Sequence, residues 1–316
     1  MTSLDARLAA AGVTTAYASV SFSRGARDGE RRSFDHTSKV IRDLSEARKH
    51  TRVDHRIHAR FDITFDNAVG VLEKLIAEGR VDLVSLMDHT PGQRQYRNLE
   101  VHIKNKAAYH GVSEPEARQM VTTAIAERTR PQDVLLSNMH AVSRLCKSKG
   151  VPLASHDDDT VDKANLMADL GAVISEFPVT PEAALAAVGR GMMTAMGAPN
   201  AMRGQSYSGN LSAREAHRQG LLHILAADYH PGAILAAVKA LADQDPDDLA
   251  GAARLASANP AKALGLADRG TMELGKRADI FVADRNNRVA LTIRDGQVIH
   301  SDGTIPLETQ VLQPAE

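Results

Sequence analysis

Two short apolar segments of the sequence end in side chains that could do chemistry. Val151–Ser155 is followed by His156, and the segment Leu221–Ala227 is followed by Asp228. A carboxylate at the end of a buried strand is poorly solvated, which is unfavourable unless a metal or a hydrogen-bond network compensates. We therefore predict that His156 and Asp228 belong to a metal or acid–base site. For the aspartates that follow His156, Asp157–Asp159, an acidic helix start is the alternative.

A third apolar segment, Leu83–Met87, also ends in two polar residues. Asp88 and His89 follow it directly, a Pro-Gly turn comes next, and Arg94 lies just beyond the turn. A carboxylate and an imidazole delivered to a loop suit a metal or an acid–base group, although Asp-His before a Pro-Gly turn is also ordinary turn chemistry. We favour the functional interpretation.

The segment His55–Asp62 alternates polar and apolar residues. If it is a strand, its period of two places His58, Arg60 and Asp62 on one face and the apolar residues on the other. These three polar groups would then point into a barrel interior. The alternative is an edge strand with a solvated face.

The segment Gly197–Asn210 is rich in glycine and carries one arginine, Arg203, together with Asn200 and Ser206. Loops late in a barrel commonly hold phosphate, because backbone N–H groups and a guanidinium suit its oxygens. We predict a phosphate-binding loop here, and a flexible loop without ligand is the alternative.

Seven strand-like segments separate these groups and alternate with helical ones, which predicts a parallel sheet with helical crossovers. A doubly wound sheet and a (β/α)₈ barrel both fit. Functional side chains at six strand ends (Asp62, His89, His156, Glu176, Asn200 and Asp228) favour the TIM-type (β/α)₈ barrel. The predicted strands are Thr14–Phe22, Arg56–Thr64, Asp82–Met87, Val151–Ser155, Ala172–Phe177, Met193–Met196 and Leu221–Ala227.

The predicted helices follow from capping residues and apolar periodicity. They span Leu4–Ala11, Asp35–His50, Asn67–Glu78, Glu114–Arg128, Val161–Leu170, a helix capped by Thr180, Ser212–Gln219, Gly232–Ala242 and Pro246–Ser257. Because a helix comes first, we expect a barrel that lacks its first strand. Alternating segments near the C-terminus predict a small β appendage, with residues 1–265 forming the barrel and 266–316 the appendage.

The overall charge is nearly neutral, with 38 Lys and Arg against 39 Asp and Glu. No basic field is therefore available to attract nucleic acid or an anionic membrane. Cys146 is the only cysteine, which excludes an intrachain disulfide and a cysteine-built metal site and fits a reducing compartment. No apolar run has the length of a membrane helix. We expect a cytoplasmic protein.

Several of these segments together carry a resemblance to a known family: SLMDHTPGQRQ, ASHDDDT, SEFPVT, MGAPNAMRGQSYSGN, AADYHP and NPAKALGLADRGTMELGKRADIFVAD. On them the sequence resembles the amidohydrolase superfamily and, within it, the diphosphatases of phosphonate degradation by the carbon–phosphorus lyase pathway. The match runs from about Ser3 to His300. The resemblance implies a metal-dependent barrel that converts α-D-ribose 1-methylphosphonate 5-triphosphate to the 5-phosphate and pyrophosphate.

The resemblance also implies roles for individual residues. His156 matches the histidine ligand of barrel strand five, and Asp228 matches the strand-eight aspartate that ligates the metal or takes a proton from metal-bound water. His89, with Asp88, matches the strand-four pair, and Asp62 stands where the family usually has Glu. The expected metal ligands are thus Asp62, His89, His156 and Asp228 for a divalent ion (Zn, Mn or Mg), and the expected polyphosphate contacts are Arg60, Arg94, Asn200, Arg203 and Ser206.

The sequence departs from the family at its start and in one loop. Nothing before Ser3 supplies the His-x-Asp motif of the first barrel strand, and Tyr207 replaces a usual histidine. Either the true start lies upstream of Met1 or the protein is degenerate, and we expect weak metal affinity in this chain. A deaminase or cyclic-amide hydrolase, or a metal-poor pseudoenzyme that acts as a binding partner, are the alternatives. A phosphorylated small molecule is the expected partner, and the protein could also form a homo-oligomer.

Overall fold

The protein is described from a computed structural model that places most of the chain. The described residues are 1–22, 34–65, 68–88, 99–204, 206, 210–243, 245 and 247–307. His89 and Arg94, two of the predicted site residues, lie outside them, as does Tyr207.

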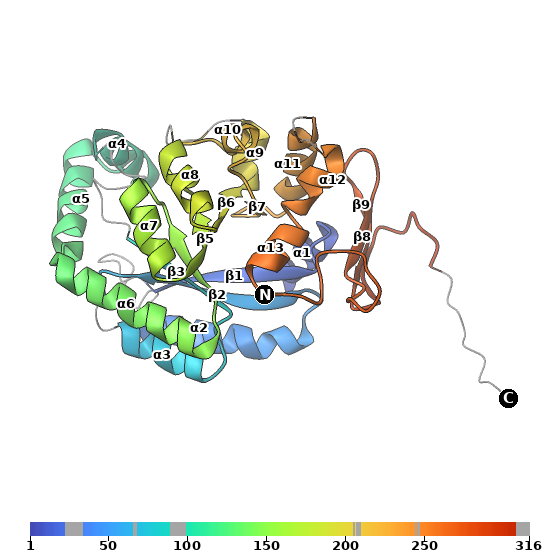
Figure 1. The fold of residues 1–316 in the computed structure, drawn as a ribbon, viewed down its shortest axis with the longest axis horizontal. Coiled ribbons are helices and arrows are strands. Elements are labelled where there is room, and N and C mark those ends of the chain that lie inside the picture. Colours follow the sequence, from blue (N-terminus) through green and yellow to red (C-terminus); the bar gives the residue numbers. More distant parts are fainter. Residues whose placement is uncertain are drawn as a thin grey trace.

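A seven-stranded parallel sheet forms the centre of the molecule (Figure 1). Its strands pair in the order of the sequence, so that β1 and β7 are its two outer strands, and each adjacent pair is parallel. This confirms the predicted α/β architecture with seven strands. The strands are β1 (Thr15–Phe22), β2 (Asp54–Asp62), β3 (Leu83–Met87), β4 (Leu153–His156), β5 (Ala172–Glu176), β6 (Met193–Gly197) and β7 (Ile224–Ala226).

Helices precede, separate and follow the strands along the chain, and several of them pack on the outer face of the sheet. They are α1 (Thr2–Ala10), α2 (Phe34–Ala47, continued by a 3-10 turn at Arg48–His50), α3 (Val69–Ala77), α4 (Leu99–His110), α5 (Glu114–Arg128), α6 (Gln132–Lys149), α7 (Val161–Asp169), α8 (Pro181–Gly189), α9 (Ala198–Arg203), α10 (Ala213–Arg218), α11 (Ala233–Ala242), α12 (Asp248–Arg254) and α13 (Ala258–Ala263). Apolar residues of β2 and β3 pack against α2, α3 and α6 in the largest cluster of buried side chains.

Side-chain caps begin several helices, as the sequence predicted. Ser113 and Glu116 form a complete capping box at α5. Thr160 accepts from the backbone N–H of the third residue of α7, Thr180 does the same at α8, and Ser212 does so at α10. These hydroxyls satisfy N–H groups that have no partner within the helix.

The structure contains helices that were not predicted, on either side of α5 and in the glycine-rich segment. The chain between β3 and β4 contains α4 and α6 in addition to α5, and the predicted loop Gly197–Asn210 begins with the helix α9. Two of its glycines are helix ends: Gly197 is the N-cap, and Gly204 is the C-cap at φ 79°. A left-handed glycine is a common helix terminator, which explains why a glycine-rich composition looked like a loop.

The sheet curls because its inward side chains meet in one apolar cluster. Leu83, Ala154, Ile174, Ala195 and Ile224 form this inner cluster, and Tyr17 of β1 packs against it. Leu264, at the end of α13, also packs against this cluster. Because one cluster joins side chains from β1 and from β3 to β7, the sheet must bend round on itself.

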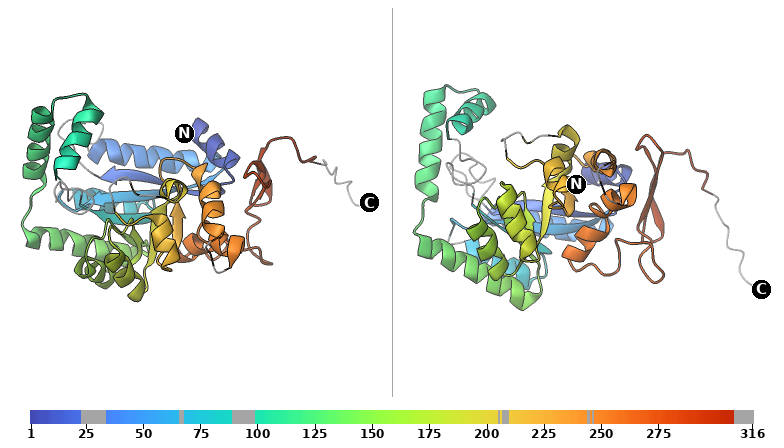
Figure 2. Two further views of the ribbon diagram at one scale, coloured as in Figure 1. Left: turned by 90° about the horizontal axis from the view of Figure 1, so that it is seen from above. Right: turned by 45° about the horizontal axis from the view of Figure 1, so that its top comes forward.

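A small antiparallel sheet lies at the C-terminal end of the described chain. It consists of β8 (Ile280–Ala283), β9 (Val289–Arg294) and β10 (Gln297–Ser301) in the order β10–β9–β8. Figure 2 shows this sheet at the end of the molecule opposite α4 and α5. The predicted β appendage is thus present, and the domain boundary at residue 265 stays a prediction.

Contacts between distant parts of the sequence attach the C-terminal region to the first elements. The Thr292 hydroxyl of β9 donates to the carbonyl of Ala9 in α1 at 2.7 Å. Arg269 donates from Nη1 to Thr15 Oγ1 and to Asp54 Oδ2, both at 2.8 Å. The N-terminal ends of β1 and β2 are therefore held by a residue from the C-terminal part of the chain.

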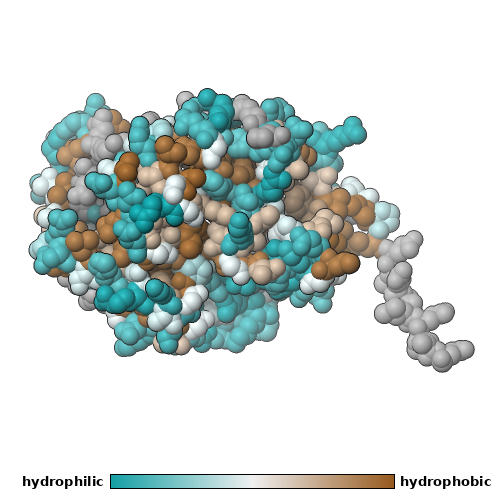
Figure 3. Space-filling model, viewed as in Figure 1, coloured by the Kyte–Doolittle hydropathy of each residue, from teal (hydrophilic) through white to brown (hydrophobic). Residues whose placement is uncertain are grey.

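The surface seen in Figure 3 carries small apolar groups separated by polar residues. Among the helices that the structure describes, none has the length and apolar character needed to cross a membrane.

Asp5 of α1 is buried and binds three donors from the beginning of β2. Its carboxylate accepts from the backbone N–H of Arg52 at 3.0 Å, from that of Val53 at 3.1 Å and from His55 Nε2 at 2.9 Å. Burial raises the pKa of Asp5, but these hydrogen bonds outweigh it and leave the pKa below its ordinary value. Asp5 therefore fixes α1 against β2.

We expect Asp5→Ala to lower the free energy of unfolding by about 3 kcal/mol, because it leaves buried donors without an acceptor. Urea unfolding at pH 7 measures this, and exposed Asp35→Ala is the matched control. A group with a lowered pKa stabilises the fold above its unfolded pKa of about 4, and the contribution is lost as the pH falls through the folded value. The difference in the free energy of unfolding between wild type and Asp5→Asn should therefore become smaller as the pH is lowered. Equal unfolding midpoints for wild type and Asp5→Ala at pH 7 would contradict this assignment.

Candidate functional site

A pocket of about 300 Å³ opens at the carboxyl ends of the strands. It is lined by Arg60, His156, Asp157, Phe177, Pro178, Met196, Gly197, Asn200, Arg203, Ser206, Asn210, Leu211, Asp228 and Tyr229. The predicted site residues Arg60, His156, Asn200, Arg203, Ser206 and Asp228 thus line one cavity. Their convergence follows from the parallel sheet, whose strands all end on the same side.

A buried polar layer separates this pocket from the apolar cluster inside the sheet. The His58 ring lies 3.2 Å from Ser19 Oγ through Nδ1 and 2.9 Å from Ser85 Oγ through Nε2. Its Nε2 is also 3.6 Å from Glu176 Oε1. Burial lowers the pKa of His58, which keeps the ring neutral, and the two hydroxyls can donate or accept as its tautomer requires.

Arg60 binds the imidazole of His156 directly. Its Nη2 lies 2.8 Å from His156 Nε2, and its Nε lies 3.1 Å from Met87 Sδ. A guanidinium only donates, so Nε2 of His156 must accept, and the ring carries its proton on Nδ1. That nitrogen lies 3.1 Å from Asp157 Oδ2. Both ring nitrogens of the buried His156 therefore face charged groups.

Asp228 lies at the mouth of the pocket, beyond the end of β7. The residue is exposed, whereas the sequence predicted a poorly solvated group. Partial burial raises the pKa of Asp228, and the charges of Arg60, Arg203 and His156 oppose this rise. The raised pKa makes the carboxylate a better proton acceptor than an ordinary aspartate.

Three residues just after strands of the parallel sheet have left-handed backbone angles although they are not glycines. Asp157 follows β4 with φ 52°, Phe177 follows β5 with φ 55°, and Asp228 follows β7 with φ 54°. All three line the pocket. Such conformations are costly, above all for a bulky side chain, and they concentrate at functional sites.

The outer wall of the pocket comes from α9 and the loop after β7. Arg203 donates from Nη1 to the hydroxyl of Tyr229 at 2.8 Å. Asn200 uses its side-chain oxygen to accept from the backbone N–H of Ala213 at 3.0 Å, which fixes the start of α10. The sequence identified Arg203 and Asn200 but missed Tyr229, although it directly follows Asp228, and Phe177, whose ring centroid is 5.4 Å from that of His156.

The predicted ligand Asp62 and the neighbouring carboxylate of Asp158 have partners of their own. Asp62 is fully buried, pairs with Arg128 Nη1 at 3.1 Å and accepts from Thr64 Oγ1 at 2.6 Å. It does not line the pocket, and its role as a metal ligand stays a prediction. Asp158 accepts hydrogen bonds from Ser155 and, at 2.6 Å, from Ser175, so it connects β4 to β5.

The donor types in the pocket fit a divalent cation, but their number and arrangement do not. Within the described part of the chain, no three His, Cys, Asp or Glu side chains lie together as a metal would require. His156 and Asp228 are suitable donors, yet Arg60 is bonded to the Nε2 atom of His156.

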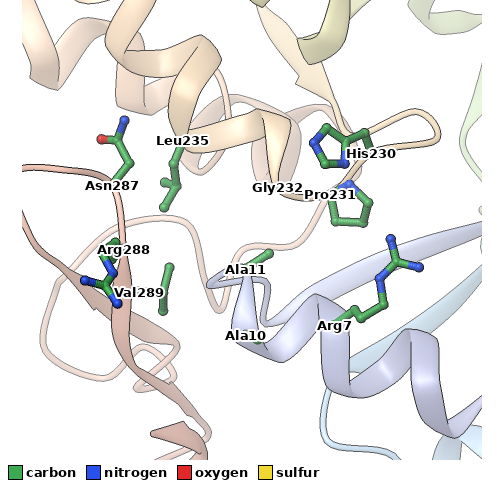
Figure 4. Close-up of a pocket in the computed structure, with 10 residues that line it drawn as sticks. All are labelled: Arg7, Ala10, Ala11, His230, Pro231, Gly232, Leu235, Asn287, Arg288 and Val289. Atoms are coloured by element: carbon green, nitrogen blue, oxygen red, sulfur yellow. The ribbon is translucent and has the colours of Figure 1, made fainter. Parts of the chain in front are cut away.

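A second pocket, of about 370 Å³, lies between α1, the start of α11 and the beginning of β9. Figure 4 shows Arg7 and His230 on one of its sides and Asn287 and Arg288 on the other. Its lining contains no carboxylate. It therefore lacks the acid–base pair that the strand-end pocket has.

Comparison with known proteins identifies a matching family and a relative within it. The Amidohydrolase family model matches residues 10–299. The alpha-D-ribose 1-methylphosphonate 5-triphosphate diphosphatase of Escherichia coli (strain K12) is 38% identical over 291 residues, which are 91% of this chain and 76% of that protein.

Solved structures share the fold at low sequence identity. N-acetylglucosamine-6-phosphate deacetylase from Thermotoga maritima has a TM-score of 0.58 at 14% identity, over 95% of this chain and 82% of the other. Beta-aspartyl dipeptidase from Fervidobacterium islandicum has a TM-score of 0.56 at 13% identity, over 94% and 77%. The family match and the strand-end pocket agree that the chain belongs to the amidohydrolase family.

Proposed function

We propose that this protein hydrolyses α-D-ribose 1-methylphosphonate 5-triphosphate to the 5-phosphate and pyrophosphate. The observation that carries the proposal is the strand-end pocket, in which Asp228 lies within the electrostatic influence of both Arg60 and Arg203. The 38% identical relative, a diphosphatase for this substrate, supports the same conclusion.

The two arginines suit a polyphosphate chain. A triphosphate carries several negative charges, and a guanidinium binds phosphate oxygens in a planar, bidentate manner. Arg203 is exposed at the mouth of the pocket, and Arg60 is half-buried deeper inside. They can therefore contact successive phosphates of one extended chain.

Asp228 is the residue best suited to accept the proton of the attacking water. As the water oxygen bonds to phosphorus, the anhydride P–O bond between the α- and β-phosphates breaks, and pyrophosphate is released. The water proton passes to the carboxylate of Asp228, whose raised pKa favours this transfer. The arginines offset the negative charge that develops on the phosphate oxygens.

A divalent cation, Zn, Mn or Mg, belongs to the proposal because members of the amidohydrolase family are typically metal-dependent. His156 and Asp228 are its proposed ligands, together with His89 and Asp62 from the sequence. The steps above use only the protein's own groups, because Arg60 is bonded to His156 in the arrangement described. A cytoplasmic location, consistent with the single cysteine, completes the proposal.

We expect release of pyrophosphate, and no ammonia, when the purified protein is incubated with the triphosphate and a divalent metal. A deaminase would release ammonia from its own substrates, and a cyclic-amide hydrolase would open a ring without pyrophosphate. We expect Asp228→Asn to lower kcat by at least about 100-fold, since general-base catalysis contributes that much. Asp169→Asn, which changes an exposed surface carboxylate, is the matched control. Full turnover by Asp228→Asn would refute the proton-acceptor role.

We expect Arg203→Ala to raise KM for the triphosphate about tenfold or more, because hydrogen bonds to a charged group are lost. Metal content, measured by elemental analysis, should stay unchanged. The control is Arg190→Ala, which removes an arginine paired with Asp169 on the surface. An unchanged KM for Arg203→Ala would count against a phosphate-binding role.

A further inference from the structure

The strand-end pocket has two chemically different parts. Arg60 and Arg203 form its cationic part and suit phosphate oxygens. Its apolar part consists of side chains from the end of β5, from β6 and from the segment before α10: Phe177, Pro178, Met196 and Leu211. A polyphosphate chain has no apolar surface to place against them. The pocket therefore fits a ligand that carries a less polar group next to its phosphates.

We propose that the space between the ring of Phe177 and the carboxylate of Asp228 is a sugar subsite, in which one carbon face of a ribose lies against the aromatic ring. The inference rests on the proposed function and deepens it, because it assigns the part of the pocket that selects the group attached to the phosphates.

The backbone of Phe177 is the first observation that supports this subsite. Phe177 has φ 55°, a left-handed conformation that glycine adopts readily and a bulky residue rarely adopts. Its backbone N–H donates to the carbonyl of Ala195 at 2.8 Å, which attaches the residue to β6. Because such strain concentrates at functional sites, a phenyl ring at this position indicates a role for the ring itself.

The ring of Phe177 lies between residues of the two strands that flank β5. Its centroid is 5.4 Å from that of the His156 ring, at the end of β4. Its Cε1 atom approaches Gly197, at the end of β6, where an added Cβ atom would lie 3.7 Å away. Neighbours on both sides fix the position of the ring, so it offers a preformed surface to a ligand.

Gly197 keeps the space beside the ring open. Its φ of −70° is a conformation that any residue adopts, so the backbone does not require glycine there. A Cβ atom at this position would lie 3.5 Å from Asp228 Oδ2 as well as 3.7 Å from Phe177 Cε1. Glycine thus leaves room between the ring and the carboxylate. The electron-rich face of an aromatic ring suits the C–H groups that one side of a ribose presents.

A ribose in this subsite would also explain which anhydride bond is cleaved. Asp228 is next to the space beside the Phe177 ring, and the charge of Arg203 acts on its carboxylate. A ribose against Phe177 would place its 5-phosphate beside Asp228, the proposed proton acceptor. The remaining phosphates would extend toward the arginines.

Binding of ribose 5-phosphate and of inorganic triphosphate to the purified protein tests the subsite. Dissociation constants are measured by phosphorus NMR, from the broadening of each ligand's resonances as protein is added. We expect Phe177→Ala to weaken binding of ribose 5-phosphate about fivefold or more, because the contact with an aromatic face is lost. Binding of inorganic triphosphate should stay nearly unchanged.

Two further variants keep the test decisive. Phe177→Gly also removes the ring, and glycine accommodates φ 55°, so this variant carries the test if thermal unfolding shows that Phe177→Ala does not fold. Gly197→Ala should weaken binding of ribose 5-phosphate as well, since its methyl group enters the space beside the ring.

Controls separate the sugar from the phosphates. Phe34→Ala removes a half-buried ring of α2 that does not line the pocket, and both affinities should stay unchanged. Arg203→Ala should weaken binding of inorganic triphosphate more than that of ribose 5-phosphate.

Three results would overturn the proposal. The first is that wild type does not bind ribose 5-phosphate detectably. The second is that removal of the Phe177 ring leaves this affinity unchanged, or lowers the affinity for inorganic triphosphate equally. The third is Phe177-dependent binding of free adenine that is tighter than binding of ribose 5-phosphate, which would assign the ring to a planar base.

Fragment binding needs no turnover, so its result is independent of pyrophosphate release. Phe177-dependent binding of ribose 5-phosphate by a protein that releases no pyrophosphate supports the subsite and refutes the diphosphatase. An active enzyme whose binding of ribose 5-phosphate does not depend on Phe177 does the reverse.

Discussion

The apolar cluster inside the curled sheet is the constraint on which the site depends. Side chains from β3 to β7, together with Tyr17 of β1, meet there and exclude water. Because this burial favours bending of the sheet, strands that are far apart in its hydrogen-bonding order deliver their ends to one place. Without the bend, Arg60 of β2 and Asp228 after β7 would lie at distant positions along a flat edge.

From this cluster toward the carboxyl ends of the strands, the interior of the sheet changes from apolar to polar in a single layer. Hydrogen bonds stabilise the polar side chains there. His58 is kept neutral by burial and placed among two serine hydroxyls and Glu176. In the next layer, the His156 ring lies between the charged groups of Arg60 and Asp157, each facing one of its nitrogens. Buried charges without such partners would cost several kcal/mol.

The sequence predicted the strands and the capped helices well, since alternation and caps are local signals. It missed α9 because its two terminal glycines suggested a loop, and it missed α4, which buries only Ile103 and Ala107. It also missed α6 and α13. Six of the fourteen residues that line the pocket were predicted, because each lies at or beyond the end of a strand: Arg60, His156, Asn200, Arg203, Ser206 and Asp228. The partners of the predicted site residues were not predicted: Asp62, outside the pocket, pairs with Arg128, 66 residues later, and Arg60 pairs with His156, 96 residues later. Such contacts depend on strand order and helix placement, which spacing alone does not encode.

The attachment of the C-terminal region to the first strands affects the order in which the chain can fold. Arg269 binds residues 254 and 215 positions earlier, and Thr292 binds a carbonyl 283 positions earlier. A chain emerging from the ribosome cannot form these contacts until nearly all of it has been made. The first two strands therefore wait longest for their last partners, and contacts of such high sequence separation slow folding. Until then, the N-terminal ends of β1 and β2 lack the partners that hold them in the folded protein.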